Sequence, residues 1–478
     1  MNDTQIDRAG NARIPTRAHW RVRTRVGLAA TVLIGAGVFT APSVAGGATP
    51  SWTDAGLHVV GGPVVADNMI LVNDVNTHRQ LEVSGINPTT GTVVWSAPFA
   101  QSAITAGVGF PPTSVGSMVL DFAPDGTEAN ALVYVEGLDA ATGTPIWHFT
   151  TPIQVADAPL VCGLGRYFCL TYFSSQNGTS LLELDPRSGQ PVAQVKGPER
   201  AMGTAIAGHS NTSILWQDTA TAPTFEQISP DGIVQWIRSV SSLFGGSEYD
   251  PNYGWNFNVV GALDVGMVGV RTQGAAGHLS EDLGALKTIG INTANGNRRW
   301  SAKGAYQCGG SLNFLTSVVA CVYKGVAKEV GGSLSTKGIS LTLRGLNSVS
   351  GAPSWSEPVL NVQSLSVGTR LSFVDSTHVL VENVAKKWVV LDTNNGSTIP
   401  AASNATYWCE VTSPFTIIAV TGVTNSSSRV AMPVFRGCNA EGNATNAVPS
   451  TTPANVGVNI SGMFVWASPQ GLNAVAMR

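Results

Sequence analysis

Short apolar runs separated by turn-forming residues characterise the chain from about residue 52 onward. In 63–72, two short apolar runs flank Asp67 and Asn68, a pair that favours a tight turn. The same design recurs in 158–172, 259–270 and 371–381. No long segment of this region has the periodicity of an amphipathic helix. The pattern therefore predicts an all-β protein built from short antiparallel strands.

A second pattern recurs at intervals of about 50 residues, which is typical of propellers and solenoids. The copies share an apolar residue, an Asp or Asn, a short polar stretch and a glycine, and the copy that ends at Gly232 is one residue shorter, with Asp231 directly before the glycine. The glycine can adopt the positive φ that closes a tight turn, and the Asp or Asn can accept backbone hydrogen bonds within it. The turn glycines are Gly91, Gly143, Gly189, Gly232, Gly296, Gly351 and Gly396. Four residues after the glycine stand Trp95, Trp147, Trp236, Trp300 and Trp355, with Ala193 and Pro400 at this position in the other two copies.

These repeats resemble the blade motif of the PQQ-like β-propeller family, which reads roughly Leu-Asp-x-x-Thr-Gly-x-x-x-Trp. The resemblance extends over about 52–442. It implies four-stranded blades arranged in a ring, with each tryptophan packed between neighbouring blades. The family includes quinoprotein alcohol dehydrogenases and the propeller lipoprotein of the bacterial outer-membrane assembly machine, and the repeats resemble the lipoprotein more. The motif is architectural, so it does not by itself define a function.

The number of blades depends on a degenerate copy at 437–442, within 430–444. Counting it gives eight blades, and omitting it gives seven. Trp52 precedes the first repeat without a turn motif of its own, which predicts that the start of the chain supplies the last strand of the final blade and closes the ring. The insertions 244–255 and 325–337 are too long for tight turns, and we expect them to be surface loops.

The first 48 residues differ from the rest of the chain. Residues 1–25 form a basic head with six Arg and two Asp, a net charge of +4, and 26–48 contain no charged residue. This apolar segment is long enough for one membrane-spanning helix with the basic head in the cytoplasm. Alternatively it is a signal peptide cleaved near Ser43, Val44 and Ala45. In either case 49–478 form an extracytoplasmic propeller, held at the cell membrane by a single span or secreted after cleavage.

The six cysteines fall into three pairs of sequence neighbours. An even number of cysteines in an exported chain favours disulfides, and no Cys-x-x-Cys spacing suggests a zinc site. The predicted pairs are Cys162 with Cys169, Cys308 with Cys321, and Cys409 with Cys438. Free thiols are the alternative.

The remaining composition excludes several functions. Outside the basic head the net charge is −7, since the whole chain carries −3, which argues against nucleic-acid binding. The histidines are scattered, and the motifs of serine acylation and phosphate binding are absent. A PQQ-dependent dehydrogenase commonly has two adjacent cysteines beside the quinone, and this chain has none. We therefore expect no catalytic residue, cofactor or metal, and a protein-interaction scaffold at the bacterial cell envelope. The alternatives are a ligand- or carbohydrate-binding sensor and, less favoured, a PQQ-dependent dehydrogenase.

Overall fold

The computed structural model describes most of the chain after residue 50. The described residues are 51–100, 110–124, 132–155, 158–162, 165–174, 178–196, 205–207, 214–218, 224–228, 234–245, 256–260, 263–268, 278–292, 294–307, 318–330, 333–360, 372–375, 377–420, 425–454 and 456–477. The predicted basic head and the apolar segment 26–48 therefore lie outside the described residues. Within the described ranges, no helix has the length and hydrophobicity needed to cross a bilayer.

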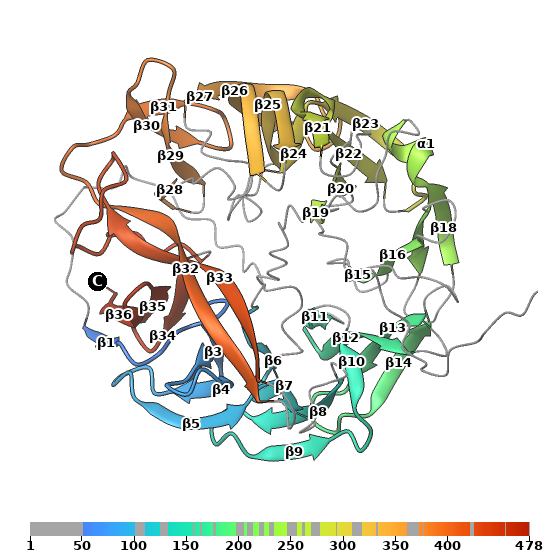
Figure 1. Ribbon diagram of the computed structural model, residues 1–478, viewed down its shortest axis with the longest axis vertical. Helices are drawn as coiled ribbons and strands as arrows, with labels where there is room; N and C mark the ends of the chain where they lie inside the picture. Colours follow the sequence, from blue (N-terminus) through green and yellow to red (C-terminus); the bar gives the residue numbers. More distant parts are fainter. Residues whose placement is uncertain are drawn as a thin grey trace, which may run out of the picture.

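Antiparallel strands form four-stranded units that stand around a central axis, as in a β-propeller (Figure 1). The units of the first half are β2 (Val64–Ala66), β3 (Met69–Val75), β4 (Leu81–Ile86) and β5 (Val93–Pro98); β6 (Thr113–Val115), β7 (Met118–Pro124), β8 (Leu132–Asp139) and β9 (Pro145–His148); β11 (Leu160–Cys162), β12 (Tyr167–Ser174), β13 (Gly178–Leu184) and β14 (Pro191–Lys196); and β15 (Ala205–Ala207), β16 (Ile214–Asp218), β17 (Thr224–Ile228) and β18 (Val234–Ser239). A short strand, β10 (Ile153–Val155), pairs with both β8 and β12 and so joins two of these units.

The second half continues the same arrangement. Its units are β19 (Asn256–Val260), β20 (Leu263–Val268), β22 (Lys287–Asn292) and β23 (Arg298–Lys303); β24 (Ala305–Gln307), β25 (Val318–Val330), β26 (Ser333–Leu346) and β27 (Pro353–Val359); β28 (Ser372–Phe373), β29 (His378–Glu382), β30 (Trp388–Asp392) and β31 (Thr398–Pro400); and β34 (Gly457–Ile460), β35 (Met463–Ser468), β36 (Gly471–Ala476) and β1 (Trp52–Asp54). The helical elements in the described ranges are short: α1 (Val240–Phe244) and a 3-10 turn at Leu283–Ala285.

The start of the chain supplies the outer strand of the last unit. β1 pairs antiparallel with β36, with Trp52 opposite Ala474 and Asp54 opposite Leu472. The Thr53 hydroxyl donates a hydrogen bond of 2.8 Å to Oδ1 of Asn473, 420 residues away in sequence. The two ends of the propeller therefore join within one sheet, as the isolated Trp52 predicts.

The degenerate copy expected at 430–444 is not a blade. Residues 425–438 form β33, which pairs with β32 (Tyr407–Val420) in a long hairpin inserted between the unit of β28–β31 and the last unit. The polar turn that follows β33 brings Ala444 back opposite Cys438. The last unit instead consists of 457–476 and β1, and it has no Asp-to-Gly turn because its third and fourth strands are not consecutive in the chain.

A second long hairpin corrects the loop expected at 325–337. β25 and β26 extend beyond their unit, and a strand from earlier in the sequence, β21 (His278–Asp282), pairs with Val326–Val330 of the extension. A register shift between Lys324 and Val326 marks the point where the extension begins. Most of this insertion is therefore sheet, whereas 246–255 of the other expected loop lie outside the described residues.

Apolar side chains fill the spaces between neighbouring units. One cluster joins the first three units and includes Leu71, Leu120 and Leu170, each 2% exposed or less. Another joins the first and last units and includes Ile70 and Leu472, both fully buried. Each strand contributes alternate residues to the two sides of its sheet, so both faces of a unit are buried against its neighbours.

Candidate functional site

The repeated tryptophans lie at the junctions between units. The indole of Trp95 packs against Gly85 of its own sheet and against Gly143 of the next unit. A Cβ added to Gly85 would lie 2.2 Å from Trp95, and one added to Gly143 would lie 2.5 Å from it. Trp95 Nε1 donates a hydrogen bond of 2.9 Å to the carbonyl of Ala140, in the same turn as Gly143. The indole therefore occupies the space that two side chains would otherwise need.

The same contact recurs around the ring. In each case the indole of one unit packs against the turn glycine of the next, and the Nε1 of Trp52, Trp147, Trp300 and Trp355 donates a hydrogen bond to a carbonyl of that turn. The pairs are Trp52 with Gly91 and Pro88 O (3.0 Å), Trp147 with Gly189 and Pro186 O (2.8 Å), Trp300 with Gly351 and Ser348 O (2.8 Å), Trp355 with Gly396 and Thr393 O (3.0 Å), and Trp236 with Gly296. Gly232 lies outside the described residues.

The Asp-to-Gly turn positions the glycine for this contact. In the second unit, Oδ1 of Asp139 accepts hydrogen bonds from the backbone N–H groups of Ala141 (3.1 Å) and Thr142 (3.0 Å). The N–H of Gly143 donates to the carbonyl of Asp139, and Gly143 has a φ of 69°. A register shift between Gly137 and Leu138 in the strand before the turn keeps Trp147 opposite Gly137. The recurring residues of the motif thus all serve the junction.

Where the motif lacks tryptophan, one junction uses a residue that the repeat does not predict. Pro400 stands at the tryptophan position of the unit of β28–β31, and Trp408 at the start of β32 is fully buried nearby. Its Nε1 donates a hydrogen bond of 2.9 Å to the carbonyl of Thr451, and its ring lies 5.2 Å from that of Trp466. Trp408 follows no turn glycine, so its position outside the motif concealed its role.

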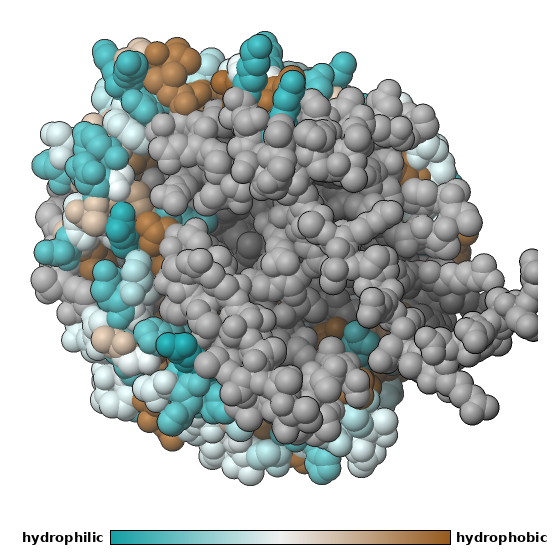
Figure 2. Space-filling model, in the orientation of Figure 1, coloured by the Kyte–Doolittle hydropathy of each residue, from teal (hydrophilic) through white to brown (hydrophobic). Residues whose placement is uncertain are grey.

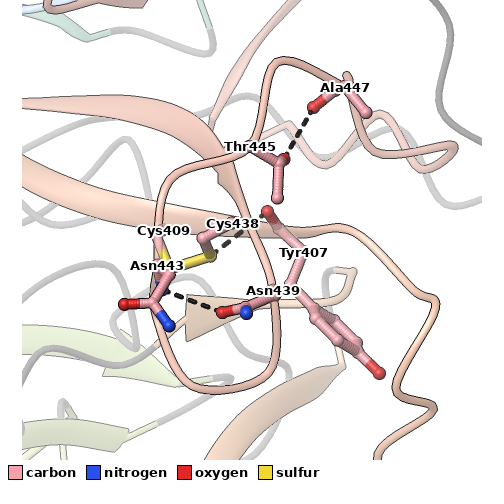
Figure 3. Close-up of a disulfide and its surroundings, with 7 residues drawn as sticks. All are labelled: Tyr407, Cys409, Cys438, Asn439, Asn443, Thr445 and Ala447. Carbon is pink, nitrogen blue, oxygen red and sulfur yellow. Dashed lines mark hydrogen bonds between the residues drawn. A yellow bond between two sulfur atoms is a disulfide. The ribbon is translucent and has the colours of Figure 1, made fainter.

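Two of the predicted disulfides are present. Cys162 and Cys169 join β11 to β12, and Cys409 and Cys438 join β32 to β33 at the base of the long hairpin, with Cα–Cα distances of 5.8 Å in both. Figure 3 shows the second disulfide beside Tyr407 and a turn in which the N–H of Asn443 donates to Oδ1 of Asn439. This pair fixes an inserted hairpin rather than a blade. Cys321 is disulfide-bonded, whereas its predicted partner Cys308 lies outside the described residues.

One cluster of side chains has the composition of a metal site but not its chemistry. The sulfurs of Cys162 and Cys169 and the carboxylate of Glu183 lie within 4.8 Å of one another. Because the two sulfurs are bonded to each other, they are not thiolates and cannot ligate a metal as thiolates do. Burial raises the pKa of Glu183, which further disfavours a negative charge here.

Two carboxyl groups are buried within the first two units. Burial raises the pKa of Asp74 to about 7, against a hydrogen bond of 2.8 Å that Asp74 accepts from the Ser84 hydroxyl. Burial also raises the pKa of Asp121 well above its ordinary value, and Oδ1 of Asp121 has no hydrogen-bond partner among the described residues. Asp121 lies opposite Glu136, which lies opposite His148, so a row of ionisable residues crosses this sheet. The buried end of the row favours the neutral acid.

An Asp–His pair closes the turn before β29. Nδ1 of His378 lies 2.9 Å from Oδ1 of Asp375, and both side chains are about one-third exposed. The hydrogen bond with Asp375 raises the pKa of His378. Burial opposes ionisation of Asp375, but hydrogen bonds from His378 and Thr377 outweigh it and lower the pKa of the carboxyl. The carbonyl of Thr377 accepts hydrogen bonds from Thr393, so this pair belongs to the turn that supports Trp355.

The outer strands expose isolated aliphatic side chains around the rim. The residue before the tryptophan position is aliphatic and more than half exposed in Val94, Ile146, Val192 and Ile399. On the described rim in Figure 2, hydrophobic and hydrophilic residues are interspersed. Single exposed aliphatic residues are normal on soluble proteins, so they do not by themselves define a binding site.

Residues 79–254 match the family model described as outer membrane protein assembly factor BamB. The chain carries PQQ-like β-propeller repeats that resemble those of BamB. The chain matches no curated protein sequence. Its structure is similar to that of BamB from Moraxella catarrhalis, with 14% identity over 87% of this chain and 98% of that chain and a TM-score of 0.38. It is also similar to quinohemoprotein alcohol dehydrogenase from Comamonas testosteroni, with 12% identity over 83% of this chain and 77% of that one and a TM-score of 0.42.

A third similar structure is the computationally designed Ika8 protein. The identity is 10% over 90% of this chain and 100% of that chain, with a TM-score of 0.40. The structures similar to this chain therefore include BamB, a dehydrogenase and a computationally designed protein. Identities of this size do not transfer an activity from any of them.

Proposed function

We propose that the protein is a non-catalytic, extracytoplasmic propeller of eight blades that acts as a protein-interaction scaffold at the bacterial cell envelope. The observation that carries this proposal is the use of the repeat residues. The indole, the turn glycine and the turn Asp or Asn serve the junctions between units, as Trp95, Gly143 and Asp139 do. The matched family model describes an assembly factor, which favours an interaction role for this chain.

The disulfides favour an oxidising compartment. Such bonds form and persist in secreted and periplasmic proteins and are rare in the cytosol. Cys162–Cys169 and Cys409–Cys438 therefore support export of 49–478, with 26–48 as the membrane anchor or the signal peptide. The last unit has four strands once β1 is included, like the other units, and counting it as a blade gives eight blades.

The test is photo-crosslinking in intact cells, with a photoreactive amino acid at Val349 or at Ile146. Val349, in a turn, is 62% exposed, and Ile146, on the outer rim, is 55% exposed. A scaffold gives a discrete adduct with an envelope protein, and the purified partner then binds the purified chain saturably. Trp147→Ala is the folding control: it should reduce binding of the partner only as far as it reduces the fraction of folded protein.

Two results would overturn the proposal. The first is quinone-dependent dye reduction by the purified chain, which would indicate a dehydrogenase. The second is saturable binding of a sugar with no protein adduct at any exposed position, which would indicate a ligand sensor.

A further inference from the structure

The hairpin of β32 and β33 is long and firmly held at its base. Its ladder runs without a break from Tyr407 opposite Cys438 to Val420 opposite Asn425, a length of roughly 45 Å at about 3.3 Å per residue. The Cys409–Cys438 disulfide and the buried Trp408 fix the base. In Figure 1 the hairpin runs across the ring from the side of β28 toward β7. A continuous two-stranded ribbon therefore extends from the blade junction at which it begins.

The prolines of the hairpin show which backbone groups point outward. Pro414 lies opposite Ala431, and Pro433 lies opposite Thr412. Proline has no N–H to donate, so in an unbroken ladder it occupies a position whose backbone groups point away from the partner strand. The alternation of an antiparallel strand then assigns every even-numbered residue of β32 to the outer edge.

Two contacts at the base agree with this assignment. Trp408, an even-numbered residue, pairs outward with Phe373 of β28. On the other strand, the carbonyl of Gly437, opposite Trp408, accepts a hydrogen bond from the N–H of Thr445 across the outer edge of β33. The outward-pointing groups of the distal half of β32 are therefore those of Thr416, Ile418 and Val420.

The two halves of this edge differ. In the proximal half, Trp408 is paired and Pro414 removes a donor. In the distal half, 415–420, the described part of the chain places no strand against β32. An unpaired edge invites another strand, and proteins usually protect it with charged residues, proline or a cover. Residues 415–420 contain no charge and no proline, and they are rich in the β-branched residues that favour strands.

The opposite edge of the hairpin has another composition. Residues 425–429 of β33 comprise Asn425, three serines and Arg429. A strand of this composition has a lower preference for sheet pairing than 415–420. Of the two outer edges of the hairpin, the distal edge of β32 is therefore the better candidate for pairing with a further strand.

The other long hairpin of the chain shows what covers such an edge. There the extension of β25, Val326–Val330, pairs with the five-residue strand His278–Asp282. That extended segment comes from a distant part of the sequence and satisfies the backbone groups of β25. The corresponding position on β32 has no such strand among the described residues.

We propose that the distal edge of β32, residues 415–420, binds an extended, uncharged segment of a partner protein as an added antiparallel strand. The inference rests on the interaction role proposed above and names the surface that performs it. The backbone groups of Thr416, Ile418 and Val420 supply the hydrogen bonds, as in other cases of strand addition. We expect the partner segment to be uncharged, because residues 415–420 offer no charged side chain that could pair with a charge on the added strand.

The test uses the full-length chain in detergent and a fluorescein-labelled nine-residue peptide that alternates Val and Thr. The key variant is Ile418→Pro, which removes one outward N–H and leaves the ladder with β33 intact. The matched control is Ser427→Pro, because Ser427 lies opposite Ile418 and its backbone points to the other edge. Thermal unfolding and the absence of free thiols establish that both variants fold.

We expect saturable binding of the peptide, measured by fluorescence anisotropy. Ile418→Pro should weaken it roughly tenfold, as expected for loss of one hydrogen bond at the edge. Ser427→Pro should leave binding unchanged. Equal weakening by both variants, or no saturable binding to the wild-type chain, would overturn the proposal. Concentration-dependent dimerisation that Ile418→Pro abolishes would assign the edge to a second copy of the chain instead. If the crosslinked envelope partner persists with Ile418→Pro, the scaffold role stands and the edge is not its docking site.

Discussion

Trp52, in the first strand of the described chain, packs against Gly91, in the turn that ends the third strand of the first unit. A Cβ at Gly91 would lie 2.5 Å from this indole, whose Nε1 donates a hydrogen bond of 3.0 Å to the carbonyl of Pro88. Trp52 belongs by pairing to the last unit, opposite Ala474. The contact that joins the ends of the ring is therefore the same one that joins the units within it.

Removal of this indole should open the ring. Trp52→Ala is expected to cost about 2–4 kcal/mol, below the value for a fully buried aromatic residue because this indole is only partly buried. Trp147→Ala, at an internal junction, should cost a similar amount because its contacts are equivalent. Thermal and denaturant unfolding of the fragment from Ala48 onward measure both. A mutant that lost binding while keeping full stability would contradict the architectural role at its position.

Replacement of a turn glycine tests the junction from the other side. Gly143→Ala forces a Cβ against Trp95 and also imposes a positive φ on alanine. Gly116→Ala is the matched control, since Gly116 has a φ of 61° but no neighbour within 4 Å of an added Cβ. The control should lose about 1 kcal/mol from its backbone alone, and Gly143→Ala should lose clearly more. Equal losses in the two variants would show that the indole moves aside at little cost.

Asp74 should make the protein less stable as the pH rises. Its pKa is about 7 in the folded state and 3.8 as the ordinary value, so the folded state binds the proton more tightly. Stability then falls between about pH 4 and pH 7 and is lower by a constant amount above that range. Asp74→Asn removes the ionisation and keeps an acceptor for Ser84. The variant should be more stable than wild type at pH 8, on the order of a few kcal/mol, and nearly equal at pH 4. Denaturant unfolding of wild type and variant between pH 4 and pH 8 measures this difference. If the two proteins lost stability with pH in the same way, Asp74 would not be the group responsible.

The two disulfides should stabilise the fold to different extents. They close loops with sequence separations of 7 and 29 residues. Loss of loop entropy in the unfolded chain predicts about 2–3 kcal/mol for Cys162–Cys169 and about 3–4 kcal/mol for Cys409–Cys438. The double variants Cys162→Ser with Cys169→Ser, and Cys409→Ser with Cys438→Ser, compare them directly. The reverse order would mean that strain or residual structure outweighs loop length.

The repeat could be predicted because it is local and recurs. Asp139, Gly143 and Trp147 lie within nine residues of one another, and the same spacing of Asp or Asn, Gly and Trp returns at Gly91, Gly296 and Gly351. The same locality explains the predicted pairs 162–169 and 409–438, whose members flank hairpins. Physical requirements that repeat at each junction leave a regular trace in the sequence.

Non-repeated contacts leave no such trace. The hydrogen bond from Trp408 to Thr451 spans 43 residues and occurs at one junction. The sheet character of Val326–Val330 depends on His278–Asp282, which lie far away in the sequence. The prediction of a blade at 430–444 is wrong because the last unit, 457–476 with β1, lacks the turn that identifies the other units. Since β1 provides its outer strand, no turn connects its last two strands.

The position of β1 also fixes the order of events when the protein is made. Synthesis produces Trp52 before all the other units and its partner Ala474 after them, so the ring stays open until every unit has emerged. A nascent chain that stops before β34 lacks three of the four strands of the last sheet. Its first strand, β1, then has no partner strand. Products truncated before the last unit therefore keep the ring open and should be recognised as unfolded by proteases and chaperones.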